Sequence, residues 1–193
     1  MEEPPRTITV SDLLNSNDGA KKIIGAVYNK LYAWETHSFS WIGLTSIASD
    51  DADKGGIAGD TGADKHELDN WTFNPSGISF SEVWSTNFQG VGRATQALQD
   101  LPLTNTDAAS KNRFIGEAKM LRAYFYFNLV RTFGGVPKID KVLTSQAEIE
   151  AASAKVTANE IYALIESDLN DAISKLPVTI PAAENGRVTK GAA

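Results

Sequence analysis

The segment between Pro102 and Pro137 constrains the fold most, because it predicts one long helix that is apolar around most of its circumference. Two sets of apolar residues recur there at three- and four-residue steps: Ile115, Ala118, Leu121, Phe125 and Leu129 on one side, and Met120, Tyr124 and Phe127 on another. Gly134-Gly135-Val136-Pro137 ends the pattern, because glycine allows a left-handed cap and proline cannot continue a helix. The helix predicted over 107–132 must therefore be buried on more than one side by other helices.

Further helical segments predict an all-α fold, and strand signals are scarce. Helices are expected from Asn17 or Asp18 to Trp34, and over 39–48, 79–101, 145–152 and 157–175, with a short first turn capped at Thr9 to Asp12. Capping boxes, in which a hydroxyl and a carboxylate satisfy free backbone donors at a helix start, are predicted at Ser79–Glu82, Ser145–Glu148 and Thr157–Glu160. The pair 107–132 and 157–175 predicts tetratricopeptide-like helical hairpins with long loops, although no strict 34-residue period is visible.

We interpret residues 1–193 as one helical region that is incomplete at its C-terminus. Thr189 predicts a helix N-cap, and Gly191-Ala192-Ala193 would form only the first turn of that helix. Inside the region, residues 49–78 predict a long loop insertion rich in Asp, Gly, Asn and Pro. Loops of this length are usually functional or disordered, and Trp71 and Phe73 favour an ordered one.

The composition excludes several kinds of site. The chain has no cysteine and only His37 and His66, which excludes thiolate chemistry and disfavours a histidine metal site. A net charge of −6 disfavours a nucleic-acid partner. We interpret the acids of 50–69 as a solvated loop and the bases of 111–141 as a basic-sided helix. Calcium binding by Asp50, Asp51, Asp53, Asp60 and Asp64 stays open, because their spacing is not that of an EF-hand. We expect no metal and no cofactor.

The sequence contains no membrane-spanning segment and no recognisable secretory leader. No stretch approaches the roughly 20 uninterrupted apolar residues of a spanning helix. Met1 to Pro5 lacks the basic and apolar regions of a signal peptide. The protein is therefore either cytoplasmic, or Met1 replaces a leader that is normally removed.

The stretch from Phe114 to Pro137 closely resembles the signature helix of the SusD/RagB family. Three further segments resemble that family in the same order, namely Trp84 with 90–98, 161–173 and 186–193. The sequence departs from the family pattern at 86–89 and 151–155, and members of the family are longer. The resemblance implies a SusD-like α-α superhelix in a surface lipoprotein of Bacteroidetes-type bacteria. Such a protein is anchored to the outer membrane through a lipidated cysteine that this chain lacks, and it captures glycans or other nutrients, without catalysis, for a SusC-like TonB-dependent transporter.

Trp71 is the best candidate for contacting a sugar. The apolar C–H face of a sugar ring packs on indole, while amides and carboxylates bond its hydroxyls, and Asp69, Asn70 and Asn74 supply those groups nearby. The other tryptophans, Trp34, Trp41 and Trp84, lie at helical spacing and are expected in the core. His66 is expected on the loop surface.

Two other classes of protein remain as alternatives. One is an intracellular helical-repeat adaptor that binds peptides or proteins in a concave groove. The other is a carbohydrate-active enzyme with paired carboxylates, although no pair in the sequence identifies itself as one.

Overall fold

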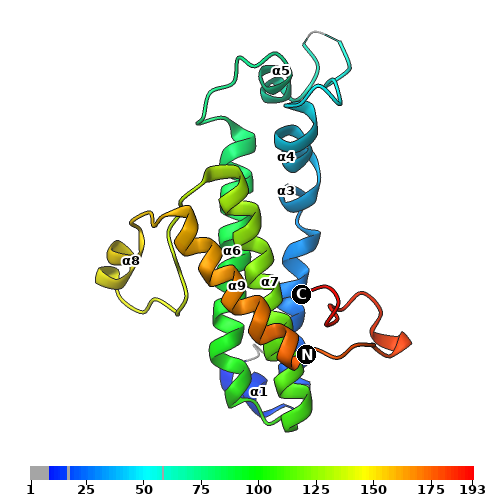
Figure 1. Cartoon of the computed structure of the whole chain (residues 1–193), viewed down its shortest axis with the longest axis vertical. Helices are drawn as coiled ribbons and strands as arrows, with labels where there is room; N and C mark the ends of the chain where they lie inside the picture. The colour runs from blue at the N-terminus through cyan, green and yellow to red at the C-terminus, as the bar shows by residue number, and fades with distance from the viewer. Residues whose placement is uncertain (1–8, 17, 58) are drawn as a thin grey trace, which may run out of the picture. The chain divides into compact units, whose positions relative to one another are not determined.

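A computed structural model describes residues 9–16, 18–57 and 59–193, and these residues form an all-α structure (Figure 1). The predictions for Met1 to Pro5 and for Asn17 lie outside this described part. Within it, backbone pairing of the sheet type is limited to one isolated bridge between Pro137 and Lys155. The α-helices are α1 Val10–Asn15, α2 Gly19–Asn29, α3 Trp34–His37, α4 Phe39–Ile42, α5 Ala63–Asp69, α6 Ile78–Asp100, α7 Ala108–Phe133, α8 Gln146–Ala152 and α9 Ala158–Lys175. Short 3-10 helices span Lys30–Tyr32, Leu101–Leu103 and Ala182–Glu184, and a π-helical turn spans Gly43–Ile47.

The chain divides into two compact units. The bundle unit consists of residues 1–28 and 90–193, and the insert unit of residues 29–89. Helix α6 begins in the insert unit and ends in the bundle unit.

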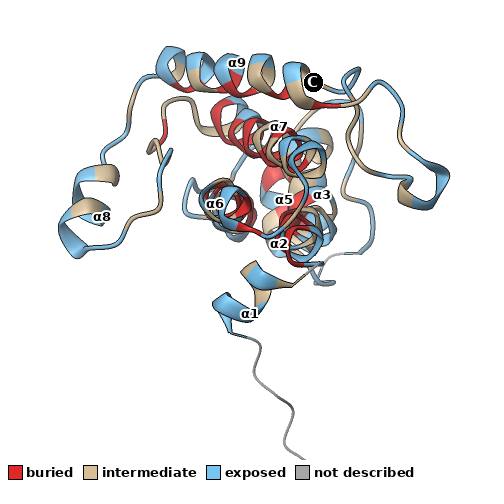
Figure 2. Cartoon of the chain, turned by 90° about the horizontal axis from the view of Figure 1, so that it is seen from below, coloured by how far each residue is buried: buried red, intermediate tan, exposed pale blue. Residues whose placement is uncertain are grey.

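In the bundle unit, the predicted helical hairpin is confirmed, because α9 packs along α7. Phe114, Phe125 and Leu129 of α7 and Ile161 of α9 are fully buried. Figure 2 shows buried positions on both helices where they face each other. Helix α6 approaches α7 so closely at Gly90 that an added Cβ would lie 2.6 Å from the ring of Phe125. The predicted capping box at Thr157 also forms, since Thr157 accepts a hydrogen bond from the Glu160 N–H and Glu160 accepts one from the Thr157 N–H.

Five of the seven basic residues of 111–141 pair with acids, so these residues do not form one solvated basic face. The other two, Lys111 and Arg131, donate to the Pro102 carbonyl and to the Asn128 side chain. Arg122, nearly fully buried, makes a two-pronged bond to Asp168 of α9, with Nε–Oδ2 at 2.7 Å and Nη2–Oδ1 at 2.9 Å. Its Nη1 also donates to the Asp140 carbonyl at 3.2 Å. Lys119 pairs with Asp171 at 2.9 Å. A buried guanidinium requires such partners, because an unpaired charge away from water is very costly.

A second ionic cluster holds the segment after α9 against α7. Glu117 is fully buried and accepts from Arg187 at 2.7 Å, while Arg113 lies 3.4 Å from it and donates to Glu184 at 2.6 Å. Burial raises the pKa of Glu117, and the two arginines only partly offset that effect. The predicted helix start at Thr189 is present as one turn, closed by Ala192 N–H donating to the Thr189 carbonyl at 3.0 Å.

The insert unit differs most from the sequence predictions. The first long helix was expected to reach Trp34, but it ends at Asn29 and the chain is extended at Ala33. Buried Thr36 donates its hydroxyl to the Lys30 carbonyl at 3.0 Å, and this bond replaces a helical partner. Trp34 is consequently 63% exposed and not in the core, while Trp41 and Trp84 are half-buried.

The capping box predicted at Ser79 and Glu82 is wrong. Ser79 is buried within α6 and donates to Asp64 at 2.5 Å, and Glu82 accepts from the hydroxyl of Ser40. Both side chains bond residues distant in sequence. The stretch predicted as loop contains the helix α5, whose N-cap Gly62 has a φ of 88°.

Candidate functional site

The end of α5 places Trp71 on the surface in an unusual backbone conformation. Trp71 has a φ of 57°, the only positive φ of a non-glycine residue in the described part of the chain. The Thr72 N–H donates to the Glu67 carbonyl at 2.9 Å and the Trp71 N–H to the Leu68 carbonyl at 3.3 Å. These two bonds form a Schellman motif, in which the left-handed position is usually glycine. The Trp71 side chain is nevertheless 70% exposed, so no burial of the indole offsets this backbone cost of roughly 1–2 kcal/mol.

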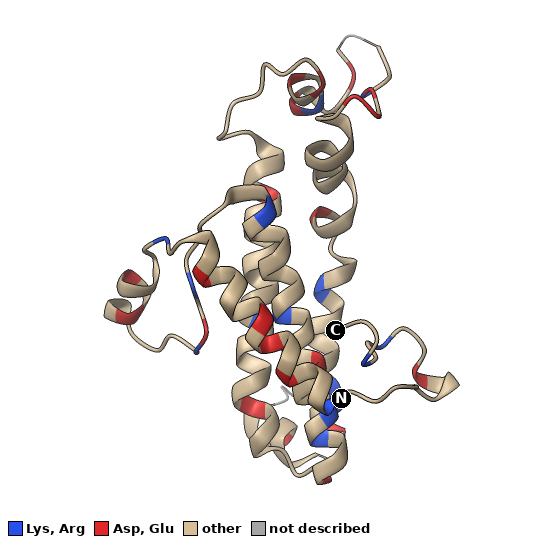
Figure 3. Ribbon diagram, in the orientation of Figure 1, with Lys and Arg blue, Asp and Glu red and all other residues tan. Residues whose placement is uncertain are grey.

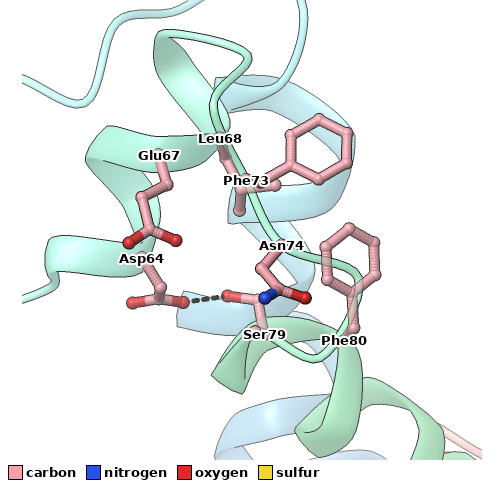
Figure 4. Close-up of a pocket in the computed structure, with 8 residues that line it drawn as sticks. Asp64, Glu67, Leu68, Phe73, Asn74, Ser79 and Phe80 are labelled. Carbon is pink, nitrogen blue, oxygen red and sulfur yellow. Dashed lines mark hydrogen bonds between the residues drawn. The ribbon is translucent and has the colours of Figure 1, made fainter.

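Three neighbouring aromatic rings lie in sequence here, and we call them the aromatic row: Trp71, Phe73 and Phe80. The ring centroids of Trp71 and Phe73 lie 6.4 Å apart, and those of Phe73 and Phe80 lie 5.5 Å apart. Phe73 and Phe80 line a shallow crevice with Asp64, Glu67, Asn74 and Ser79. Figure 4 shows the two rings on one side of this crevice and the two carboxylates on the other. Apolar ring faces thus lie beside hydrogen-bonding groups.

The base of the crevice is fixed by a buried polar chain. Asp64 accepts from Ser79 and, at 2.9 Å, from Lys65, which is only 1% exposed. Burial alone would raise the pKa of Asp64, but the bonds from Ser79 and Lys65 outweigh it and hold this pKa below its usual value. Asp64 is therefore an ionised structural anchor, whereas Glu67 is exposed at the rim.

The predicted site residues take different positions around this crevice. Trp71 is exposed, and Asn74 lines the crevice with its Oδ1 accepting from the Ser76 N–H at 2.9 Å. Asn70 caps the end of α5 and donates to the His66 carbonyl at 2.8 Å. Asp69 accepts from the Lys54 N–H at 3.4 Å and so holds the preceding loop. Phe73, Phe80 and Glu67 were not predicted as site residues, because no local pattern shows that they meet.

The acidic side chains of the insert unit do not gather around one point. In the ribbon of Figure 3, acidic positions are spread along the loop before α5 and on α5 itself. In the described part of the chain, no group of three or more His, Asp or Glu side chains is placed to hold a metal ion. Asp60 pairs with Lys54, and that bond lowers the pKa of Asp60. Among the described helices, none combines the length and apolar character needed to cross a membrane.

The bundle unit also has an apolar groove of about 220 Å³ between α7 and α9. Its lining residues are Met120, Ala123, Tyr124, Phe127, Tyr162, Ile165, Leu169 and Ala192. The Met120, Tyr124 and Phe127 side of α7, predicted to be buried, is therefore only partly covered. Phe127 and Tyr162 each remain 38% exposed.

Comparison with known proteins identifies the family. A SusD-like family model, described as starch-binding and associating with the outer membrane, matches residues 11–193. The chain belongs to the SusD-like family. This finding confirms the resemblance of the Phe114–Pro137 segment to the signature helix of SusD/RagB proteins.

Individual relatives of this SusD-like chain agree with that assignment. SusD-like protein P2 of Formosa agariphila is 35% identical over 158 residues, which cover 80% of this chain and 31% of that protein. A solved structure described as a laminarin-binding SusD-like protein is 33% identical, with a TM-score of 0.79 over 92% of this chain and 38% of that one. Surface glycan-binding protein A from Bacteroides thetaiotaomicron, solved with laminarihexaose, shares the fold at 21% identity, with a TM-score of 0.73 over 91% of this chain and 36% of that one. The tetratricopeptide-like helical fold is thereby confirmed, and the chain spans about a third of the length of these relatives.

Proposed function

We propose that this chain is the part of a cell-surface glycan-binding protein that presents the aromatic row as a sugar-contacting surface. The observation that supports this most is Trp71, a large apolar side chain that is exposed on a left-handed backbone position. Neither packing nor backbone preference favours tryptophan there. Residues held in such conformations cluster at binding sites, where the strain is part of the function.

The chemistry of the crevice suits a carbohydrate. The axial and equatorial C–H groups of a sugar ring form apolar faces that pack against indole and phenyl rings. The hydroxyl groups at the edge of the sugar require acceptors and donors, which the exposed Glu67 carboxylate and the Asn74 amide provide. The site is shallow and open, as expected for a surface that binds part of a long polymer.

The proposed role in the cell follows from the family description. A protein that associates with the outer membrane and binds starch-like polymers would deliver them to a transporter. We propose a TonB-dependent, SusC-like transporter as the partner and a lipidated cysteine as the membrane anchor. Binding without hydrolysis is part of the proposal, because Asp64 is bonded to Ser79 and Lys65 and is not poised as an acid or base.

Replacing Trp71 tests the proposed site. Laminarin and starch are suitable probes, since a 33% identical relative is described as laminarin-binding and the family as starch-binding. Trp71→Ala should weaken binding of the cognate polymer by about tenfold or more, because the stacking surface is lost. Isothermal titration with the full-length protein measures this change, and circular dichroism should remain helical.

Val178→Ala provides the matched control, because Val178 is 76% exposed and lies in the bundle unit. The Val178→Ala variant should bind laminarin or starch with the same affinity as the wild type. Equal affinities for Trp71→Ala and the wild type would remove Trp71 from the site. Release of reducing sugars by the purified protein would contradict the non-catalytic part of the proposal.

A further inference from the structure

The insert unit carries a second pair of exposed aromatic rings, separate from the aromatic row. Trp34 is 63% exposed and Phe39 is 42% exposed. Their ring centroids lie 6.5 Å apart, with 34° between the ring planes. We call these two residues the outer aromatic pair. Contiguous exposed apolar surface, unlike scattered single apolar side chains, is a feature of ligand-binding sites.

Phe39 is held from beneath by a buried charge. The Lys65 ammonium lies 3.9 Å from the centroid of the Phe39 ring, and Lys65 is almost fully buried. A desolvated ammonium over an aromatic face is strongly attracted to it. Lys65 is also bonded to Asp64, which accepts from Ser79 of α6. One face of the Phe39 ring is thus occupied and fixed, and the exposed part of the ring is oriented before any ligand arrives.

Trp34 is exposed because the backbone turns it outward. A continuous helix from α2 would place Trp34 on the same apolar stripe as Ile24 and Val27, which are fully buried. The extended residue Ala33 interrupts the helix, and the hydrogen bond from Thr36 to Lys30 stabilises the interruption. The chain therefore forms a specific local structure that presents an indole to solvent.

The outer aromatic pair and Trp71 are connected through one short helix. Phe39 contacts Lys65 and lies against Gly62, at the N-terminal end of α5, and Trp71 follows its C-terminal end. A helix of seven residues is on the order of 10 Å long. This separation is within the reach of a chain of a few sugar residues.

We propose that Trp34 and Phe39 form a second sugar-binding subsite, so that one neutral glycan chain contacts the outer aromatic pair and the aromatic row together. This inference rests on the proposed function and adds a subsite and a ligand class to it. The ligand is neutral because the insert unit holds nine acidic and three basic residues, which disfavours uronate or sulfated polymers. A protein partner is disfavoured, because a standard protein–protein interface buries about 800 Å² on each side. The exposed surface of two aromatic side chains is far smaller than that area.

The test compares a long and a short ligand. In the full-length protein, Trp34→Ala should weaken laminarin binding by about five- to tenfold and leave binding of laminaribiose unchanged, since a disaccharide cannot span both subsites. Trp34→Phe should retain most of the affinity for laminarin. Leu103→Ala, at an equally exposed apolar residue of the bundle unit, serves as the control and should change neither affinity. Alginate should bind far more weakly than laminarin.

The outcomes separate this inference from the proposed function. Normal laminarin affinity of Trp34→Ala, with weakened affinity of Trp71→Ala, would overturn the second subsite alone. Unchanged glycan affinity with a lowered melting temperature, or with lost co-purification of the transporter, would assign Trp34 to packing or to a protein interface and also overturn it. A wild-type protein that binds neither laminarin nor starch would overturn both proposals.

Discussion

The bundle unit and the insert unit use the same residue types in opposite ways. In the bundle unit, Phe114, Phe125 and Tyr126 are buried, and Arg122 is neutralised by Asp168 inside the α7–α9 contact. In the insert unit, large aromatic side chains remain exposed and the helices are short. These three aromatic side chains of the bundle unit contribute to packing, whereas Trp34, Phe39 and Trp71 of the insert unit are exposed to solvent. The difference teaches that a candidate binding surface is to be sought where large apolar side chains stay exposed instead of packing into a core.

Breaking the buried charge pair of the bundle unit should have the largest effect. Arg122→Ala leaves the buried Asp168 with only the longer contact to Lys119 at 3.5 Å, which is expected to lower the free energy of unfolding by about 3–5 kcal/mol. Urea denaturation followed by circular dichroism measures this loss. Lys141→Ala removes a surface pair with Glu148 and should cause a much smaller change. Similar losses of unfolding free energy for the two variants would contradict the greater importance of the buried charge pair.

Close packing of the bundle unit can be tested at two neighbouring glycines of α6. Gly90→Ala forces a methyl group to within 2.6 Å of the Phe125 ring, and it should destabilise the protein by about 1–3 kcal/mol. Gly92→Ala meets no atom within 4 Å and should stabilise the helix by about 0.5–1 kcal/mol. Thermal melts of both variants provide the measurement. A melting temperature that rises for Gly90→Ala would show that α6 and α7 do not approach as described.

A modest difference in stability between two variants of Trp71 separates backbone strain from binding. Both Trp71→Gly and Trp71→Ala remove the indole, so both should lose glycan affinity equally. Glycine adopts the left-handed conformation freely, and Trp71→Gly should therefore be about 1 kcal/mol more stable than Trp71→Ala. Equal stabilities would indicate that the left-handed conformation at the end of α5 is not retained in solution.

The signals that predicted structure correctly were local ones. The periodicity of 107–132 and the glycines and proline after it predicted α7 to within a residue or two. The Thr157 capping box predicted the start of α9, since its two hydrogen bonds join residues three apart. The composition near Trp71 indicated a candidate binding loop, but the helix α5 and the Schellman motif that orient this residue were not predicted.

Some residues that match a local sequence pattern form their hydrogen bonds with residues distant in sequence instead. Ser79 and Glu82 match a capping box, yet they bond Asp64 and Ser40, because these buried contacts satisfy their polar groups better than the helix end does. Trp34 fits an apolar stripe, yet the bond between Thr36 and Lys30 supports a break that exposes it. In both cases the deciding atoms lie outside the local pattern.

The sequence by itself predicted the all-α class, the helices of the α7–α9 hairpin and the resemblance to the SusD/RagB family, because helix periodicity, caps and the signature segment can be read from residues close together in the chain. A buried arginine such as Arg122 needs a partner for its charge. Only the tertiary structure decided that the partner is Asp168, 46 residues away, and that Trp71, Phe73 and Phe80 form one row. The physical reason is that the packing of the helices decides which distant residues are buried together and hydrogen-bonded. The same packing decides which side chains remain exposed at the surface.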